Sequence, residues 1–132
     1  MRIFVDTSAF YALLDGGDEN HGAAKGAWTQ MLNAGDPSVT SNYVLVETFA
    51  LLQNRLGMAA VRGFQEDVMP VVHLEFISPE QHQSGISALL AADRRGLSLV
   101  DCVSFEVMRH LGIRTVFCFD THFRKQGFTL IP

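Results

Sequence analysis

Short apolar runs alternate along the chain with longer stretches in which apolar residues recur every three or four positions. The short runs predict five strands, at residues 2–5, 37–40, 71–77, 115–119 and 128–131. In the third run, Val72, Leu74 and Phe76 alternate with His73 and Glu75, which predicts one buried and one solvent-facing side. Strands that alternate with helices indicate an α/β fold, here a three-layer α/β/α sandwich with a central, mainly parallel sheet.

The longer stretches predict helices, and several of these begin at a residue suited to cap them. The expected helices cover residues 8–14, 21–34, 42–56, 58–69, 79–95 and 99–111. Ser41, Ser78 and Ser98 are the expected N-caps of three of them. Gln81 lies three residues after Ser78 and would complete a capping box. Pro70 is expected to end the helix that begins near residue 58.

Length and composition predict one folded domain over residues 1–132. Of these residues, 48% are hydrophobic and 18% are charged, a balance that favours a packed core over disorder. Fourteen acidic residues against ten Lys and Arg give a formal net charge of -4. This charge excludes a protein that coats nucleic acid through a broadly basic surface. An anionic substrate would have to meet a local basic patch or bound cations.

The two cysteines and the absence of targeting signals indicate a reducing environment. Cys102 and Cys118 lie inside apolar runs and form no Cys-x-x-Cys pair, so we expect buried free thiols. The apolar stretch near Met1 is too short for a signal-peptide core, and no run is long enough to span a membrane. We therefore expect a soluble, cytoplasmic protein without a membrane partner.

Four carboxylates stand apart from other charged residues: Asp6, Glu47, Asp101 and Asp120. Each lies in a run with the pattern of core, where an ionised carboxylate is costly unless it is hydrogen-bonded or holds a cation. Structural roles are open for three of them. Asp6 and Asp101 could cap helices, and Asp120 could form an Asx-turn. Glu47 has no Lys or Arg three or four residues away and is therefore the hardest to explain structurally.

The predicted fold brings these carboxylates to one edge of the sheet. Asp6 and Asp120 follow strands, and Asp101 lies in the first turn of a helix that a parallel sheet would start on the same side. Converging acids repel each other, and a divalent cation with oxygen ligands relieves that repulsion. We therefore expect Asp6, Glu47, Asp101 and Asp120 to hold one or two Mg²⁺ or Mn²⁺ ions. Clustered His or Cys ligands for zinc are absent near these acids.

The segments around these acids resemble the PIN-domain family of metal-dependent ribonucleases, which includes the VapC toxins of toxin–antitoxin pairs. The resemblance covers essentially the whole chain. It is carried, in order, by IFVDTSAF at residues 3–10, NYVLVET at 42–48, LSLVDCVSF at 97–105 and FCFDTHF at 117–123. It implies hydrolysis of RNA phosphodiester bonds with Asp6, Glu47, Asp101 and Asp120 as metal ligands and catalytic acids. A small antitoxin and a homodimer are the partners it implies.

Other residues are candidates for supporting roles. The hydroxyls of Thr7 and Ser104 could orient a carboxylate or a water molecule, although hydroxyls often only cap helices. His122, Arg124 and Lys125 follow Asp120 closely and could form a basic lip that contacts RNA phosphates. A solvated turn would explain these three residues equally well.

Other functions remain open from the sequence. The chain could be a solitary PIN nuclease outside a toxin–antitoxin pair, or a non-catalytic module whose acidic pocket receives an arginine from a partner. A phosphotransferase of the haloacid-dehalogenase type would need a second acid where Ser8 stands. A response-regulator receiver would need an acid pair at the end of the first strand, which this chain lacks.

Overall fold

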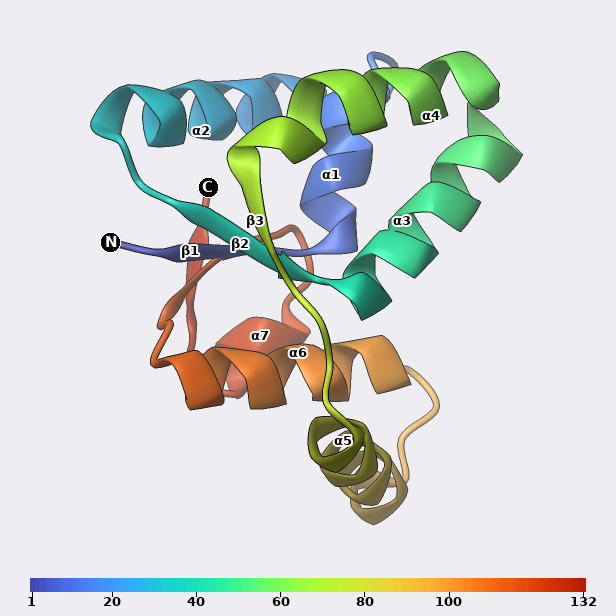
Figure 1. Cartoon of the computed structure of the whole chain (residues 1–132), viewed down its shortest axis with the longest axis vertical. Helices are drawn as coiled ribbons and strands as arrows, with labels where there is room; N and C mark the ends of the chain where they lie inside the picture. The colour runs from blue at the N-terminus through green and yellow to red at the C-terminus, as the bar shows by residue number, and fades with distance from the viewer.

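The computed structural model describes all residues 1–132 and contains a five-stranded sheet with helices on both faces (Figure 1). The strands are β1 (Ile3–Val5), β2 (Ser38–Ser41), β3 (Val72–Glu75), β4 (Thr115–Phe117) and β5 (Thr129–Ile131). They lie in the order β3-β2-β1-β4-β5, and every neighbouring pair is parallel. The structure therefore confirms the predicted α/β fold, with a sheet that is fully parallel.

The helices form the two outer layers. They are α1 (Thr7–Leu14), α2 (His21–Ala34), α3 (Asn42–Arg55), α4 (Met58–Gly63), α5 (Pro79–Ala92), α6 (Leu99–Leu111) and α7 (His122–Lys125). Figure 1 shows α1, α2 and α4 above the sheet and α5, α6 and α7 below it, with α3 leaving the end of β2. No helix of the structure is both long enough and apolar enough to cross a membrane.

Three predictions about local structure were wrong. The expected helix at 58–69 ends at Gly63 and continues as the π-helical η1 (Phe64–Val68) and the 3₁₀ turn η2 (Met69–Val71). Pro70 lies inside η2, because the start of a helix leaves its N–H groups unbonded in any case. Phe76 lies beyond β3 and is 72% exposed. Asp93 ends α5 in a left-handed conformation, with φ of 50°, before the two arginines that follow.

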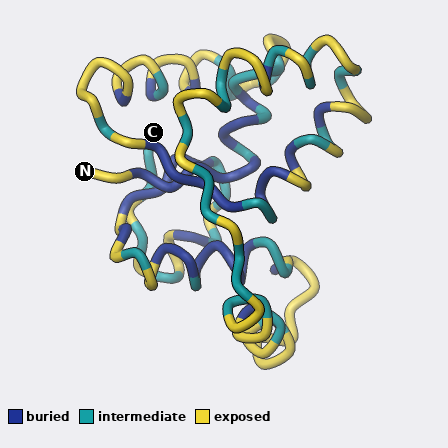
Figure 2. Tube along the Cα trace, viewed as in Figure 1, coloured by how far each residue is buried: buried dark blue, intermediate teal, exposed yellow.

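The core fills the space between the sheet and the helices, as the buried stretches in Figure 2 show. Phe4, Phe10 and Phe117 are completely buried, and Trp28 stacks on Phe117 with ring centroids 6.4 Å apart. Trp28 therefore packs the core. The cysteines are free and buried, as predicted, and burial raises the pKa of the Cys118 thiol to about 12.

The carboxyl edge of the central strands collects the starts of several helices. The Asp6 N–H donates to the Phe117 carbonyl at 3.1 Å, so the pairing of β1 with β4 continues one residue past the end of β1. Helix α1 begins immediately afterwards, and α3 begins directly after β2. This edge is where open parallel sheets bind ligands.

Candidate active site

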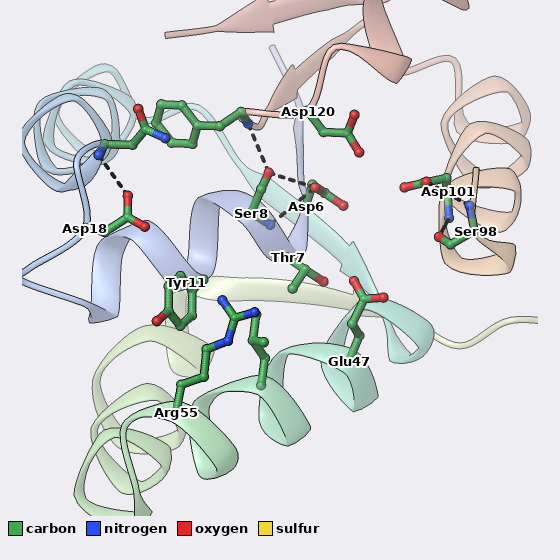
Figure 3. A pocket seen from close by; sticks show the side chains of 13 residues that line it. Asp6, Thr7, Ser8, Tyr11, Asp18, Glu47, Arg55, Ser98, Asp101 and Asp120 are labelled. Carbon is green, nitrogen blue, oxygen red and sulfur yellow. Dashed lines mark hydrogen bonds between the residues drawn. The ribbon is translucent and has the colours of Figure 1, made fainter. Parts of the chain in front are cut away.

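A polar pocket opens at this edge, and all four carboxylates singled out from the sequence line it (Figure 3). We call it the acid pocket. It is lined by Asp6, Thr7, Ser8, Tyr11, Asp18, Asn20, Glu47, Leu51, Arg55, Ser98, Asp101, Phe119 and Asp120. Figure 3 shows Asp6, Glu47, Asp101 and Asp120 arriving from four different elements around one space. The fold therefore brings the predicted acids together.

Asp6 is both a helix cap and a member of the acid pocket. One carboxylate oxygen, Oδ2, accepts hydrogen bonds from the Ser8 N–H at 3.2 Å and the Ser8 hydroxyl at 2.8 Å. The side chain of Ser8 in turn accepts from the Phe119 N–H at 2.9 Å, which ties α1 to the chain after β4. Burial raises the pKa of Asp6 from 3.8 to about 7, against the Ser8 hydrogen bonds and with help from the charges of Asp101 and Asp120.

Asp101 likewise combines two roles. The side chain of Ser98 accepts from the Asp101 N–H at 3.0 Å, and Asp101 Oδ2 accepts from the Ser98 N–H at 3.1 Å, which completes a capping box at the start of α6. Asp101 is only 8% exposed. Burial, reinforced by the charge of Asp120, raises the pKa of Asp101 above its usual range, although the bonds to Ser98 oppose the shift. Asp101 therefore caps α6, as one interpretation predicted, and also lines the acid pocket.

Asp120 forms the predicted Asx-turn and pairs with His122. Its Oδ1 accepts from the His122 N–H at 2.9 Å. The His122 ring atom Nδ1 lies 2.9 Å from Asp120 Oδ1 and 3.8 Å from Asp101 Oδ2. One ligand atom from each of Asp101, Asp120 and His122 lies within 4.8 Å of the other two. The side chains of these three residues are therefore close enough together to hold one metal ion.

Each of the three aspartates has one oxygen engaged by the start of a helix or turn. The engaged atoms are Asp6 Oδ2, Asp101 Oδ2 and Asp120 Oδ1, and no hydrogen bond reaches the second oxygen of any of them. Their orientation is therefore set by the local backbone before any ligand arrives. The second oxygens remain available as ligand atoms.

Glu47 differs from the aspartates, and one premise about it was wrong. The sequence pattern placed it in the core, but the structure leaves it exposed on α3, where it makes no hydrogen bond or ion pair. Its helical neighbours Val44 and Thr48 carry the buried side of α3. Figure 3 shows the Glu47 carboxylate directed toward the acid pocket from the rim.

Of the candidates for supporting roles, some lie at the acid pocket and others do not. Thr7 lines the pocket, and its hydroxyl contacts the Val44 carbonyl at 3.4 Å. The Ser104 hydroxyl donates to the Val100 carbonyl at 2.7 Å inside α6, and Ser104 does not line the pocket. Arg124 and Lys125 are exposed and also lie outside the lining. Of the expected basic lip, only His122 contacts the acids.

Six polar or charged residues that line the pocket were not predicted as site residues. They are Ser8, Tyr11, Asp18, Asn20, Arg55 and Ser98. For Ser8 and Ser98 the sequence held a usable signal, since each lies two or three residues from an isolated aspartate that could accept its hydrogen bonds. Arg55 stands at the end of a helix, where basic residues are common, and nothing in the sequence links it to the acids.

The donors of the acid pocket fit a divalent cation. Burial is the main cause that raises the pKa of both Asp6 and Asp101, and the charges of neighbouring acids add to it, so a bound cation would stabilise the ionised carboxylates. Carboxylate oxygens suit Mg²⁺, and an imidazole nitrogen beside them also suits Mn²⁺. The arrangement can therefore bind a hard divalent ion and bring it to a phosphate group.

Comparison with known proteins shows the family to which the chain is similar. Residues 3–128 match the family model of the PIN domain. The chain is 41% identical over 129 residues to the 23S rRNA-specific endonuclease VapC20 of Mycobacterium tuberculosis, covering 96% of this chain and 95% of the relative. The crystal structure of that protein, described as a sarcin-ricin loop cleaving toxin, superposes with a TM-score of 0.82 at 38% identity and covers 96% of each chain.

A more distant structure shares the fold alone. FitAcB from Neisseria gonorrhoeae superposes with a TM-score of 0.70 at 15% identity and covers 100% of this chain and 97% of that one. The family model and the relative VapC20 both match nearly the whole sequence. This chain belongs to the PIN-domain family of nucleases.

Proposed function

We propose that this protein is a metal-dependent endoribonuclease that hydrolyses RNA phosphodiester bonds and acts as the toxin of a VapBC-type pair. One observation carries the proposal: four carboxylates from separate elements line one pocket in a chain 41% identical to a 23S rRNA-specific endonuclease. We take ribosomal RNA as the substrate, with the sarcin-ricin loop as the first target to test, because the relative of known structure cleaves that loop.

The residues of the acid pocket have distinct roles in this proposal. Asp6, Glu47, Asp101 and Asp120 hold one or two Mg²⁺ or Mn²⁺ ions, with His122 beside them. When bound, such ions lower the pKa of a water molecule and stabilise negative charge on the phosphate and the leaving oxygen. Ser8 and the Ser98 N–H each hold one carboxylate oxygen and leave the other directed at the site. Thr7 can position a carboxylate or a water molecule from the pocket wall.

The partners follow from the same site. A small antitoxin that inserts a basic side chain among the carboxylates would exclude both metal and RNA. We place the reaction in the cytoplasm, where ribosomal RNA is, and propose that residues 1–132 form one nuclease domain that assembles as a homodimer. A solitary nuclease and a non-catalytic docking module are the competing interpretations, and the tests below separate them.

The first test is cleavage of a sarcin-ricin loop RNA by the purified protein with Mg²⁺, with Mn²⁺ or with EDTA. We expect cleavage with either metal, none with EDTA and none by Asp6→Asn. Asp67→Asn serves as the control, because it makes the same change at an exposed acid outside the acid pocket. Full activity of Asp6→Asn would contradict the metal assignment.

Two further measurements separate the alternatives. Calorimetric titration with Mn²⁺ should show binding that Asp6→Asn weakens, whereas a docking module need not bind the metal. Expression of the wild type, but not of Asp6→Asn, should arrest bacterial growth if the protein is a toxin. Cleavage without growth arrest would favour the solitary nuclease.

A further inference from the structure

Arg55 is the one Lys or Arg side chain among the residues that line the acid pocket. It faces five carboxylates in the same lining, those of Asp6, Asp18, Glu47, Asp101 and Asp120. It is exposed and takes part in none of the ion pairs of the structure. A guanidinium beside several acids, with none of them bound to it, can accept an anionic ligand.

The position of the guanidinium is set by α1. Its central carbon lies 5.4 Å from the centre of the Tyr11 ring, within the range of a cation–π contact. The Tyr11 hydroxyl donates to Asp15 Oδ2 at 2.8 Å, which holds the ring. Figure 3 shows the Arg55 side chain reaching from α3 past Tyr11 toward the pocket. The guanidinium is therefore held beside Tyr11 in a position that is exposed to solvent.

Arg55 and Glu47 occupy opposite ends of the pocket wall that α3 provides. They are eight residues apart on this helix, a spacing that keeps both on one side and separates them by about 12 Å along the axis. The group of Asp101, Asp120 and His122 belongs to other elements: α6, the segment after β4 and the start of α7. Arg55 therefore lies at the end of the α3 wall away from Glu47 and is not a member of that group.

We propose that Arg55 is a substrate-binding residue that grips an RNA phosphate adjoining the cleaved one and thereby directs the strand along α3. This inference rests on the proposed ribonuclease function. The planar guanidinium matches two phosphate oxygens at once, which a point charge cannot do. Its charge is present with or without metal, so it supplies attraction for RNA at a pocket that is otherwise negative.

The competing explanation is structural: Arg55 could serve only to join α3 to α1 through Tyr11. The two roles differ in what they affect. A phosphate contact changes RNA affinity and its dependence on salt, because each neutralised phosphate releases counterions. A contact between helices changes the melting temperature and leaves the salt dependence as it was.

The test compares wild type with Arg55→Gln, Arg55→Lys and the control Arg62→Gln, which removes an exposed arginine of α4 outside the pocket. Binding of fluorescent sarcin-ricin loop RNA is measured by anisotropy, with Ca²⁺ in place of Mg²⁺, across a salt series. We expect Arg55→Gln to weaken binding about tenfold and to reduce the slope of log affinity against log salt by about 0.7, the value for one phosphate of a single strand. Arg55→Lys should keep the slope and lose part of the affinity.

Cleavage kinetics with Mg²⁺ complete the test. Arg55→Gln should raise KM about tenfold and change kcat by less than about twofold, since the contact lies outside the reacting group. Affinity and salt slope equal to those of Arg62→Gln would overturn the inference even if the protein cleaves RNA. A wild type that binds RNA through Arg55 but cleaves none would instead contradict the proposed function and leave the Arg55 contact standing. A wild type that binds no RNA would overturn both.

Discussion

Helices α5 and α6 both begin with a capping box, but only the box of α6 lines the acid pocket. Ser78 and Gln81 form a capping box at the start of α5, and Ser98 and Asp101 form one at the start of α6. The hydrogen bonds are nearly identical, at 3.0 and 3.1 Å in each box. The residue three positions after the cap is Gln81 in α5, a neutral and half-buried amide, and Asp101 in α6, a buried carboxylate.

The difference shows that one side chain can both cap a helix and line a polar pocket. In α5 the box only satisfies backbone donors at the helix start. In α6 it does so at the carboxyl edge of the sheet, where burial and the charge of Asp120 raise the pKa of Asp101. The capping box fixes the orientation of the Asp101 carboxylate. The negative charge of Asp120 destabilises the ionised form of Asp101, and a bound cation would relieve that repulsion.

The largest expected effect is the loss of cleavage when the charge of Asp101 in the α6 capping box is removed, compared with a charge change in the α5 box. Asp101→Asn keeps an oxygen for the Ser98 N–H and removes the negative charge, so it should lower kcat/KM at least about 1,000-fold with little loss of stability. Gln81→Glu changes the charge of the other box by the same amount and should leave cleavage unchanged. Cleavage assays and thermal melts of both variants check this. Near-normal activity of Asp101→Asn would show that Asp101 only caps α6 and has no role in cleavage.

The cost of burying a carboxylate should appear in metal-free protein as a dependence on pH. Asp6 has a pKa of about 7 in the folded state and 3.8 as its ordinary value, so the folded state binds more protons between these two values. Stability in EDTA should therefore fall as pH rises from 4 to 7, by on the order of 4 kcal/mol from this group. Asp6→Asn should remove that part of the fall.

Melting temperatures in EDTA at pH 5 and pH 8 measure the effect. The advantage of Asp6→Asn over wild type should be larger at pH 8, because the wild-type carboxylate is ionised there. Asp67→Asn, at an exposed acid, controls for the change in net charge. If the melting temperatures of wild type and Asp6→Asn differ equally at both pH values, the pKa of Asp6 is not raised by burial.

The packing between the two helices gives a smaller effect. A Cβ atom added at Gly85 of α5 would lie 2.5 Å from Val103 Cγ2 of α6, and Val103 is completely buried. Gly85→Ala should therefore destabilise the protein by about 1–3 kcal/mol, measured by denaturant unfolding. Gly26→Ala in α2 meets no atom within 4 Å and should stabilise by up to about 1 kcal/mol. Equal effects of the two changes would show that α5 is loosely held.

The smallest effect compares the caps themselves. Ser78→Ala and Ser98→Ala should each cost about 1 kcal/mol of unfolding free energy, because each removes one acceptor from a helix start. Ser98→Ala should also lower cleavage about tenfold, since the Asp101 N–H loses the side-chain acceptor that fixes the start of α6. Ser78→Ala should leave cleavage as it is. Loss of cleavage in both variants would indicate a global rather than a local effect.

Much of the fold could be predicted from the sequence because the signals are local. Alternation of short apolar runs with helical periodicity predicted all five strands, and Ser41, Ser78 and Ser98 cap the helices as expected. The segment after Gly63 escaped prediction, because its π-helical and 3₁₀ turns keep a nearly helical apolar spacing. Phe76 was misplaced, since alternation continues past the last residue that pairs with a neighbouring strand.

The chemistry of the pocket divides in the same way. The sequence by itself singled out four carboxylates that line the pocket, because Asp6, Glu47, Asp101 and Asp120 stand apart from other charges along the chain. Tertiary structure alone decided that three aspartates are buried or half-buried while Glu47 lies on the exposed rim. It also decided that Arg55 joins the acids and that Arg124 and Lys125 do not. Isolation along the chain is a local property, whereas exposure and proximity depend on how the parallel strands bring distant helix starts to one edge.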